Sequence, residues 1–415
     1  RIVMSRACTA RVLPTQRRRG RSSRATAVFA SASARESATE AAASLSAFMA
    51  DASGGGVVRF AADGLRAERD IAEGEAFLQV PEALAVTAFD ARTHPTVGEL
   101  AEGADELVAL ALWLMAERAA GDSSRWHSYI STFDSESGGV DSPLVWSEEE
   151  RDDLLRGSPA LAAARARLRA VEAEYEALAS PLSAVSASFT REAFSTALVA
   201  VFSRAFYLPS AQCFALVPVL DAGRRGAPSP TGETGSLVWV DFDVGTAAVT
   251  AVAGAPIRAG AEVRLVDTLS RNSGEMLLAC GYVDEDNAGD YLELEVGLVA
   301  ADALYMAKKS ILESVGLSAE RQSFPIYEDR LPTQLLSYLR LSRVQDSGEL
   351  LKVTFDRDAL ITDMNEYETL NLVMADLRDR MTGYSGTIDD DLRLLQPGSQ
   401  ASARERLPAQ LRPRG

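Results

Sequence analysis

The order of hydrophobic and polar residues predicts a chain of short strands, an inserted group of helices and a helical end. Alternation of apolar and polar residues is typical of half-buried strands, predicted at 57–60, 64–67, 76–80, 236–241, 247–252 and 262–266. Apolar residues at helical spacing predict helices at 104–120, 160–178, 190–208, 300–315, 333–343 and 365–381. The pattern therefore predicts an α+β protein whose last part is all-α.

The most informative stretch is 264–283, RLVDTLSRNSGEMLLACGYV. It begins as a strand, passes through a polar turn and continues as a short apolar helix. Asn272 or Ser273 is placed to cap this helix, and Glu275 in its first turn suits the helix dipole. Gly281 stands where a left-handed C-cap is expected. Taken alone, the stretch predicts a buried structural corner, and a functional interpretation depends on the rest of the chain.

The composition excludes several classes of protein. The chain has 415 residues, enough for about two or three domains and a sizeable core. No run of about 18 uncharged apolar residues occurs, so no transmembrane helix is expected. Three widely spaced cysteines and two histidines form neither a disulfide framework nor a zinc set, so no metal site is predicted. A single histidine base stays open.

The charge is unevenly distributed. Residues 1–35 hold nine arginines and no acid, which is typical of an organelle transit peptide; a disordered basic tail is the alternative. The rest of the chain carries 33 Lys and Arg against 59 Asp and Glu. Such an acidic body disfavours nucleic acid as a partner. It suits a basic protein segment, or serves only to keep the protein soluble.

Several phrases resemble the SET domain of the Rubisco large-subunit lysine methyltransferases and the helical substrate-binding domain that follows it. The SET-like phrases are 64–75, Ser203-Arg204-Ala205-Phe206, 215–225, 272–278 and 281–283; the later ones are 324–341 and 365–391. The resemblance implies a transit peptide or disordered segment at 1–45 and a mostly-β SET domain at 46–290. A helical insertion at about 92–200, a helical substrate-binding domain at 291–396 and a disordered tail at 397–415 complete the expected organisation.

The resemblance also implies a function. It predicts an S-adenosylmethionine-dependent protein-lysine N-methyltransferase of the plastid stroma, acting on the Rubisco large subunit or a similar protein, with divergent or weakened activity. Relatives in this family modify different proteins, including at histidine, so the target residue stays open. The alternative is a non-catalytic SET-fold module that binds a protein partner. A helical scaffold unrelated to SET domains is a third reading. No membrane, nucleic acid or zinc is expected as a partner.

The resemblance assigns roles to particular residues of this sequence. Cofactor contacts fall on the backbone of Ala61, Ala62 and Asp63, and on Arg204, Arg224 and Arg225; the substrate side falls on Asp221, Cys280 and Tyr282; the catalytic position falls on Asp267. A passage for cofactor and target is expected between the 264–283 corner and the segment around Asp221. The aromatic residues of 126–130 are expected to be core.

Three departures from the family pattern affect the chemistry. Asp267 replaces the catalytic tyrosine, Cys280 replaces a second tyrosine, and Arg224-Arg225 replace an Asn-His pair that holds the cofactor. Methyl transfer to lysine needs a neutral amine, whose free pKa is ~10.4, aligned with the methyl donor. Asp267 is therefore read as a hydrogen-bond acceptor or base, as a vestige of an inactive pocket, or as an alignment slip. The two arginines repel a sulfonium cation, or belong to a surface loop.

Overall fold

The computed structural model describes residues 57–61, 64–133, 140–226, 237–284, 287, 289–384, 386–396 and 399–411. The chain divides into two compact units, and each is considered by itself. Unit 1 contains the described residues up to 151 and those of 162–289. Unit 2 contains 152–161 and the described residues from 290 onward. The predicted transit peptide at 1–45 lies outside the described residues, and so do Ala62 and Asp63.

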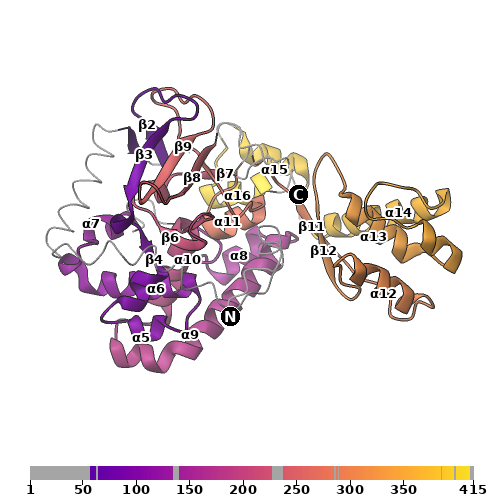
Figure 1. The fold of residues 1–415 in the computed structure, drawn as a ribbon, viewed down its shortest axis with the longest axis horizontal. Helices are drawn as coiled ribbons and strands as arrows, with labels where there is room; N and C mark the ends of the chain where they lie inside the picture. Colours follow the sequence, from indigo (N-terminus) through magenta and orange to yellow (C-terminus); the bar gives the residue numbers. More distant parts are fainter. Residues whose placement is uncertain are drawn as a thin grey trace. The chain divides into compact units, whose positions relative to one another are not determined.

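Unit 1 is built on three small sheets (Figure 1). The largest has the order β3-β9-β8-β10-β7, in which β10 runs parallel to its neighbours β7 and β8. A hairpin pairs β1 with β2, and a third sheet has the order β4-β6-β5. The strands are β1 (Val58–Ala61), β2 (Gly64–Ala67), β3 (Ala76–Pro81), β4 (Val86–Thr87), β5 (Phe206–Leu208), β6 (Cys213–Leu216), β7 (Arg225–Gly226), β8 (Val238–Asp243), β9 (Ala248–Ala253) and β10 (Leu265–Val266).

The predicted helical insertion lies between β4 and β5 in the chain (Figure 1). Its helices are α4 (Ala88–Thr93), α5 (Gly98–Ala101), α6 (Glu106–Ala120), α7 (His127–Ile130), α8 (Glu148–Leu154), α9 (Pro159–Val185) and α10 (Arg191–Arg204), with 3₁₀ turns at Gly121–Ser123 and Ser131–Phe133. The apolar residues of α6 are buried in the main core, as its periodicity predicts. Trp126 is 3% exposed, so it is a core residue as expected.

The helix predicted at 190–208 is wrong at its end. α10 ends at Arg204, and Ala205 turns to an extended conformation (ψ 135°). The next residues form β5, which pairs antiparallel with β6. Phe206 and Tyr207 are residue types enriched in strands, and the pairing with β6 fixes Phe206–Leu208 in the extended conformation.

Unit 2 begins with two strands and continues as helices. Its elements are β11 (Leu292–Val296), α12 (Tyr305–Ser314), β12 (Gln322–Ile326), α13 (Thr333–Arg343), a 3₁₀ turn at Ser347–Lys352, α14 (Asp363–Thr382), α15 (Ile388–Leu395) and α16 (Ala403–Leu411). α13 has the bounds predicted from the sequence. The disordered tail expected at 397–415 is wrong for 403–411, which form α16 and bury Ala409. None of the described helices has the length and apolar character needed to cross a membrane.

Candidate functional site

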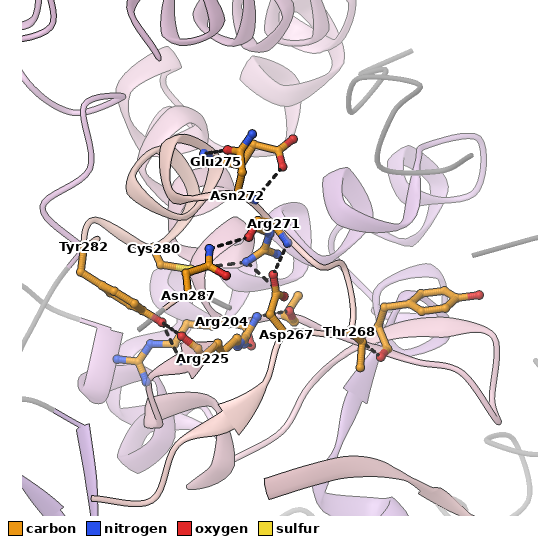
Figure 2. A network of polar contacts seen from close by, with 12 residues as sticks. Arg204, Arg225, Asp267, Thr268, Arg271, Asn272, Glu275, Cys280, Tyr282 and Asn287 are labelled. Carbon is orange, nitrogen blue, oxygen red and sulfur yellow. Dashed lines mark hydrogen bonds and ion pairs between the residues drawn. The ribbon is translucent and has the colours of Figure 1, made fainter. Parts of the chain in front are cut away.

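The 264–283 corner folds as its local sequence predicts. α11 (Ser273–Cys280) begins after Asn272, whose side chain accepts from the backbone N–H of Glu275 at 2.8 Å. Glu275 reaches back to the N–H of Asn272 at 3.3 Å, which completes a capping box (Figure 2). Gly281 takes the left-handed conformation with φ 76°. Since these are contacts within one turn, the sequence alone specifies them.

Asp267 follows β10 directly and lies inside the protein. Its backbone N–H donates to Gly226 at 2.8 Å, which extends the parallel pairing of β10 with β7. Its carboxylate accepts from the backbone N–H of Arg271 at 2.9 Å and lies 3.7 Å from Nη1 of the same arginine. Only 2% of Asp267 is exposed. The carboxylate is therefore already engaged by a cation of its own chain.

Arg271 also reaches Cys280. Its Nη1 donates to the Cys280 sulfur at 3.4 Å, and its backbone carbonyl accepts from Asn287 Nδ2 at 3.1 Å (Figure 2). Arg271 is 3% exposed. The guanidinium thus lies beside both positions at which the family pattern has a tyrosine. No sequence pattern distinguishes Arg271, because a lone arginine in a polar turn is usually solvated.

Arg225 is buried as well, so the surface-loop reading of this arginine is wrong. Its guanidinium donates to the carbonyl oxygens of Ala205 (2.8 Å) and Arg204 (2.5 Å) and stacks 4.0 Å above the Phe206 ring. These carbonyls follow the end of α10, where the helix dipole favours a cation. Burial lowers the pKa of Arg225, although Cys280 and Asp267 oppose the shift.

Arg224 and Tyr282 are partly buried and lie next to Arg225. The Arg224 guanidinium stacks 4.5 Å from the centre of the Tyr282 ring. The Tyr282 hydroxyl accepts from the backbone N–H of Arg225 at 2.6 Å and donates to its carbonyl at 3.2 Å. A Cβ atom at Gly64 would lie 3.4 Å from Arg224, so the first hairpin closes against this arginine.

Asp221 lies in a second buried cluster. It accepts a hydrogen bond from the Tyr129 hydroxyl and lies 3.5 Å from Nη1 of Arg204. Arg204 donates from Nη2 to the carbonyl of Thr132 at 2.6 Å and stacks on Phe133. Burial raises the pKa of Asp221, and Arg204 and Tyr129 oppose the shift. Burial and Asp221 both raise the pKa of Tyr129.

Sequence reasoning missed the role of Tyr129. The aromatic residues of 126–130 were assigned to the core, and Tyr129 is indeed fully buried. Its polar partner is 92 residues away in the chain, so no local pattern points to the pair.

The structure brings most of the predicted site residues together. Arg225 donates to the carbonyl of Arg204, whose guanidinium lies beside Asp221, and Figure 2 shows Arg225 near Asp267 and Cys280. The 264–283 corner and the Asp221 segment therefore lie near each other, and Asp267 and Arg271 are buried at 2% and 3% exposure. Ala61 ends β1, next to the hairpin turn. Within the described ranges, no group of three or more His, Cys, Asp or Glu could hold a metal ion.

Comparisons with known proteins match both units. The family described as "Rubisco LSMT substrate-binding" matches residues 299–414. The Rubisco large-subunit N-methyltransferase of Nicotiana tabacum is 25% identical over 81% of this chain and 70% of its own length. The fructose-bisphosphate aldolase-lysine N-methyltransferase of Arabidopsis thaliana is 25% identical over 81% and 71%. The human actin-histidine N-methyltransferase is 27% identical over 67% of this chain and 47% of its own length.

Solved structures share the fold. The SET domain of LSMT bound to lysine and AdoHcy superposes with a TM-score of 0.70, at 22% identity, over 91% of this chain and 88% of the other. Rubisco LSMT bound to AdoMet gives 0.69 over 90% and 88%. The fold is therefore α+β and is that of these SET-domain structures. Residues 299–414 match the Rubisco LSMT substrate-binding family, and the chain is similar over most of its length to Rubisco large-subunit N-methyltransferases.

Proposed function

We propose that this protein is an S-adenosylmethionine-dependent protein N-methyltransferase with a lysine target. One observation carries the proposal: Arg204, Asp221, Arg225, Asp267 and Cys280, from separate parts of the chain, lie around one place. One relative is described as a Rubisco large-subunit N-methyltransferase and another as an aldolase-lysine N-methyltransferase. The enzyme class rests on this combination of site and domains.

The Arg204–Asp221 pair fits the amino-acid end of the cofactor. Nη1 of Arg204 is buried and makes no hydrogen bond, and a guanidinium N–H suits a carboxylate. Asp221 beside it supplies negative charge for an ammonium group. Bound there, S-adenosylmethionine supplies an electrophilic methyl group. Arg204 and Asp221 would orient it, and Tyr129 would hold Asp221 in place.

The target side of the site is formed by Asp267 and Cys280. A carboxylate here accepts a hydrogen bond from an incoming lysine ammonium and would take up its proton, which leaves the neutral amine that methyl transfer needs. We propose a plastid protein as substrate, such as the Rubisco large subunit or an aldolase, because two relatives are described as chloroplastic enzymes acting on these proteins. The stroma is the corresponding location. The actin-histidine relative keeps histidine as an alternative target.

The close burial of the side chains around Asp267 favours a second function, that of a non-catalytic protein-binding module. Asp267, Arg225 and Arg271 are 2–3% exposed, which leaves no space for a target side chain beside Asp267 in this conformation. A SET-fold module that binds a protein partner without modifying it would need no such space. The two functions differ in whether the protein binds S-adenosylmethionine.

Calorimetric titration of the full chain with S-adenosylmethionine tests the proposal. We expect saturable binding that Arg204→Ala weakens about ten-fold or more, since it removes a charge-assisted hydrogen bond. Arg258→Ala is the matched control, because Arg258 is exposed and lies outside both clusters. Absence of heat and of competition at millimolar cofactor would contradict the enzyme and favour the binding module.

A further inference from the structure

Arg271 occupies the place between Asp267 and Cys280. Its Nη1 lies 3.7 Å from Asp267 Oδ1 and 3.4 Å from the Cys280 sulfur. Asp267 is 2% exposed and Arg271 is 3% exposed. A cavity wide enough for water would leave more of these side chains exposed. The guanidinium of Arg271 therefore occupies the position beside Asp267 at which the proposed enzyme would bind the side chain of its target lysine.

A strained turn brings Arg271 back to Asp267. The two residues are four apart, but they are not in a helix; the chain turns through Ser270, whose φ is 50°. Positive φ is unfavourable for a residue with a side chain. The turn is kept by the Ser270 N–H to Asp267 carbonyl bond of 2.9 Å and by the Arg271 N–H to carboxylate bond. The Asp267–Arg271 contact and the strained turn therefore support each other.

We infer that Arg271 is an internal occupant of the target site, which opens only when Arg271 leaves. The inference rests on the proposed methyltransferase function and describes the regulation of the same site. Removal of the Arg271 guanidinium takes the cation that contacts Asp267 away from a buried carboxylate, which is costly, and another cationic side chain can take its place. Lysine has the required charge and a long, narrow stem.

The surroundings of the pair allow this exchange. Thr268, Leu269 and Ser270, which carry the turn, are only partly buried, so Arg271 can move outward without unfolding the core. The 3.7 Å separation of Nη1 and Oδ1 is an ion pair but exceeds hydrogen-bond distance. Release of the turn also removes the unfavourable φ of Ser270.

Binding of a lysine side-chain probe, Nα-acetyl-lysine methylamide, tests the inference by NMR titration of the full chain. We expect Arg271→Ala to bind the probe about ten-fold more tightly than the wild type, because the carboxylate of Asp267 is released. The double variant Asp267→Asn, Arg271→Ala should lose this gain, since it lacks the charge. Arg258→Ala, at an exposed arginine, should match the wild type. If Arg271→Ala does not fold, Arg271→Gln replaces it, with a gain in the same direction.

Equal probe binding by the wild type and the Arg271 variants would overturn the inference, as would a gain that survives Asp267→Asn. A merely structural Arg271 would lower thermal stability without any gain in probe binding, which also overturns it. The cofactor titration of the wild type is read separately. Loss of cofactor binding contradicts the proposed function, whereas the probe series reports only whether Arg271 occupies a lysine-binding place.

Discussion

Arg225 and Arg340 are both buried, at 3% and 2% exposure, but their partners differ. Arg340, in unit 2, binds both oxygens of Glu366 at 2.6 and 2.9 Å and Asp358 at 2.5 Å. The hydrogen bond with Glu366 is the main cause of its raised pKa. The guanidinium of Arg225, in unit 1, donates to the backbone carbonyls of Ala205 and Arg204, and burial lowers its pKa.

The different partners of the two arginines indicate that Arg340 forms a structural ion pair, whereas Arg225 belongs to a candidate functional site. Arg340 joins α13 to α14 through Glu366 and also pairs with Asp358, so its charge is met directly by carboxylates within unit 2. In unit 1, Arg204 pairs with Asp221 and Arg271 with Asp267, whereas the guanidinium of Arg225 donates to backbone carbonyls. Several ionisable groups buried close together, with shifted pKa values at Arg225 and Asp221, are more typical of a functional site than a single ion pair is.

The largest expected effect is in unit 2. Arg340→Met removes a buried cation and leaves Glu366 without its bidentate partner, so we expect a loss of about 3 kcal/mol in the stability of α13. Native-state hydrogen exchange of the α13 amides measures it without assuming that both units unfold together. Arg330→Met is the control, because Arg330 is exposed. A loss below about 1 kcal/mol would contradict the ion-pair interpretation.

Tyr129→Phe tests the buried cluster of Tyr129, Asp221 and Arg204 in unit 1, and its expected effect is the second largest. It removes the hydrogen bond to Asp221, and we expect a loss of about 1.5–2 kcal/mol in the free energy of unfolding of unit 1. Denaturant unfolding monitored in unit 1 checks it. Tyr175→Phe keeps its ring contact with Phe194 and should change stability by less than about 0.5 kcal/mol. An equal effect of the two variants would show that the hydroxyl of Tyr129 is not important.

Arg225→Met should have a smaller effect than Arg340→Met. A methionine fills much of the volume and removes a desolvated charge, but it leaves two carbonyls without their donor. These effects oppose each other, so we expect a net change within about 1 kcal/mol of the wild type. Hydrogen exchange in α10 and β7 is the measurement. A loss as large as that of Arg340→Met would remove the distinction between the two arginines.

The smallest effect is the pH dependence contributed by Asp221. Because burial raises its pKa in the folded protein, the folded state binds this proton more tightly than the unfolded state. The stability contribution is complete below about 3.9, the ordinary value, and is lost as pH rises through the folded pKa. Asp221→Asn should therefore lose less stability than the wild type over a rise from about pH 4 to pH 7. A steeper loss in the variant would reverse the sign of the pKa shift.

The candidate site was predictable in part. Arg204, Asp221, Arg225, Asp267 and Cys280 were identified from phrases of the sequence, and the structure places them together. Their conformations were not predictable. Two contacts are not predictable from the sequence: the hydrogen bond from Tyr129 to Asp221 and the position of Arg271 between Asp267 and Cys280. Both depend on partners that a local pattern does not specify, because burial of a polar group is decided by what packs around it.

The sequence by itself determined the elements whose interactions are local. The capping box of Asn272 and Glu275, the left-handed Gly281 and the bounds of α13 follow from neighbouring residues. The tertiary structure alone decided that α10 ends at Arg204, that Arg225 lies under its last carbonyls, and that a cation fills the place beside Asp267. The reason is that sheet pairing and the desolvation of charge depend on segments distant in the chain, whose free energies exceed local propensity.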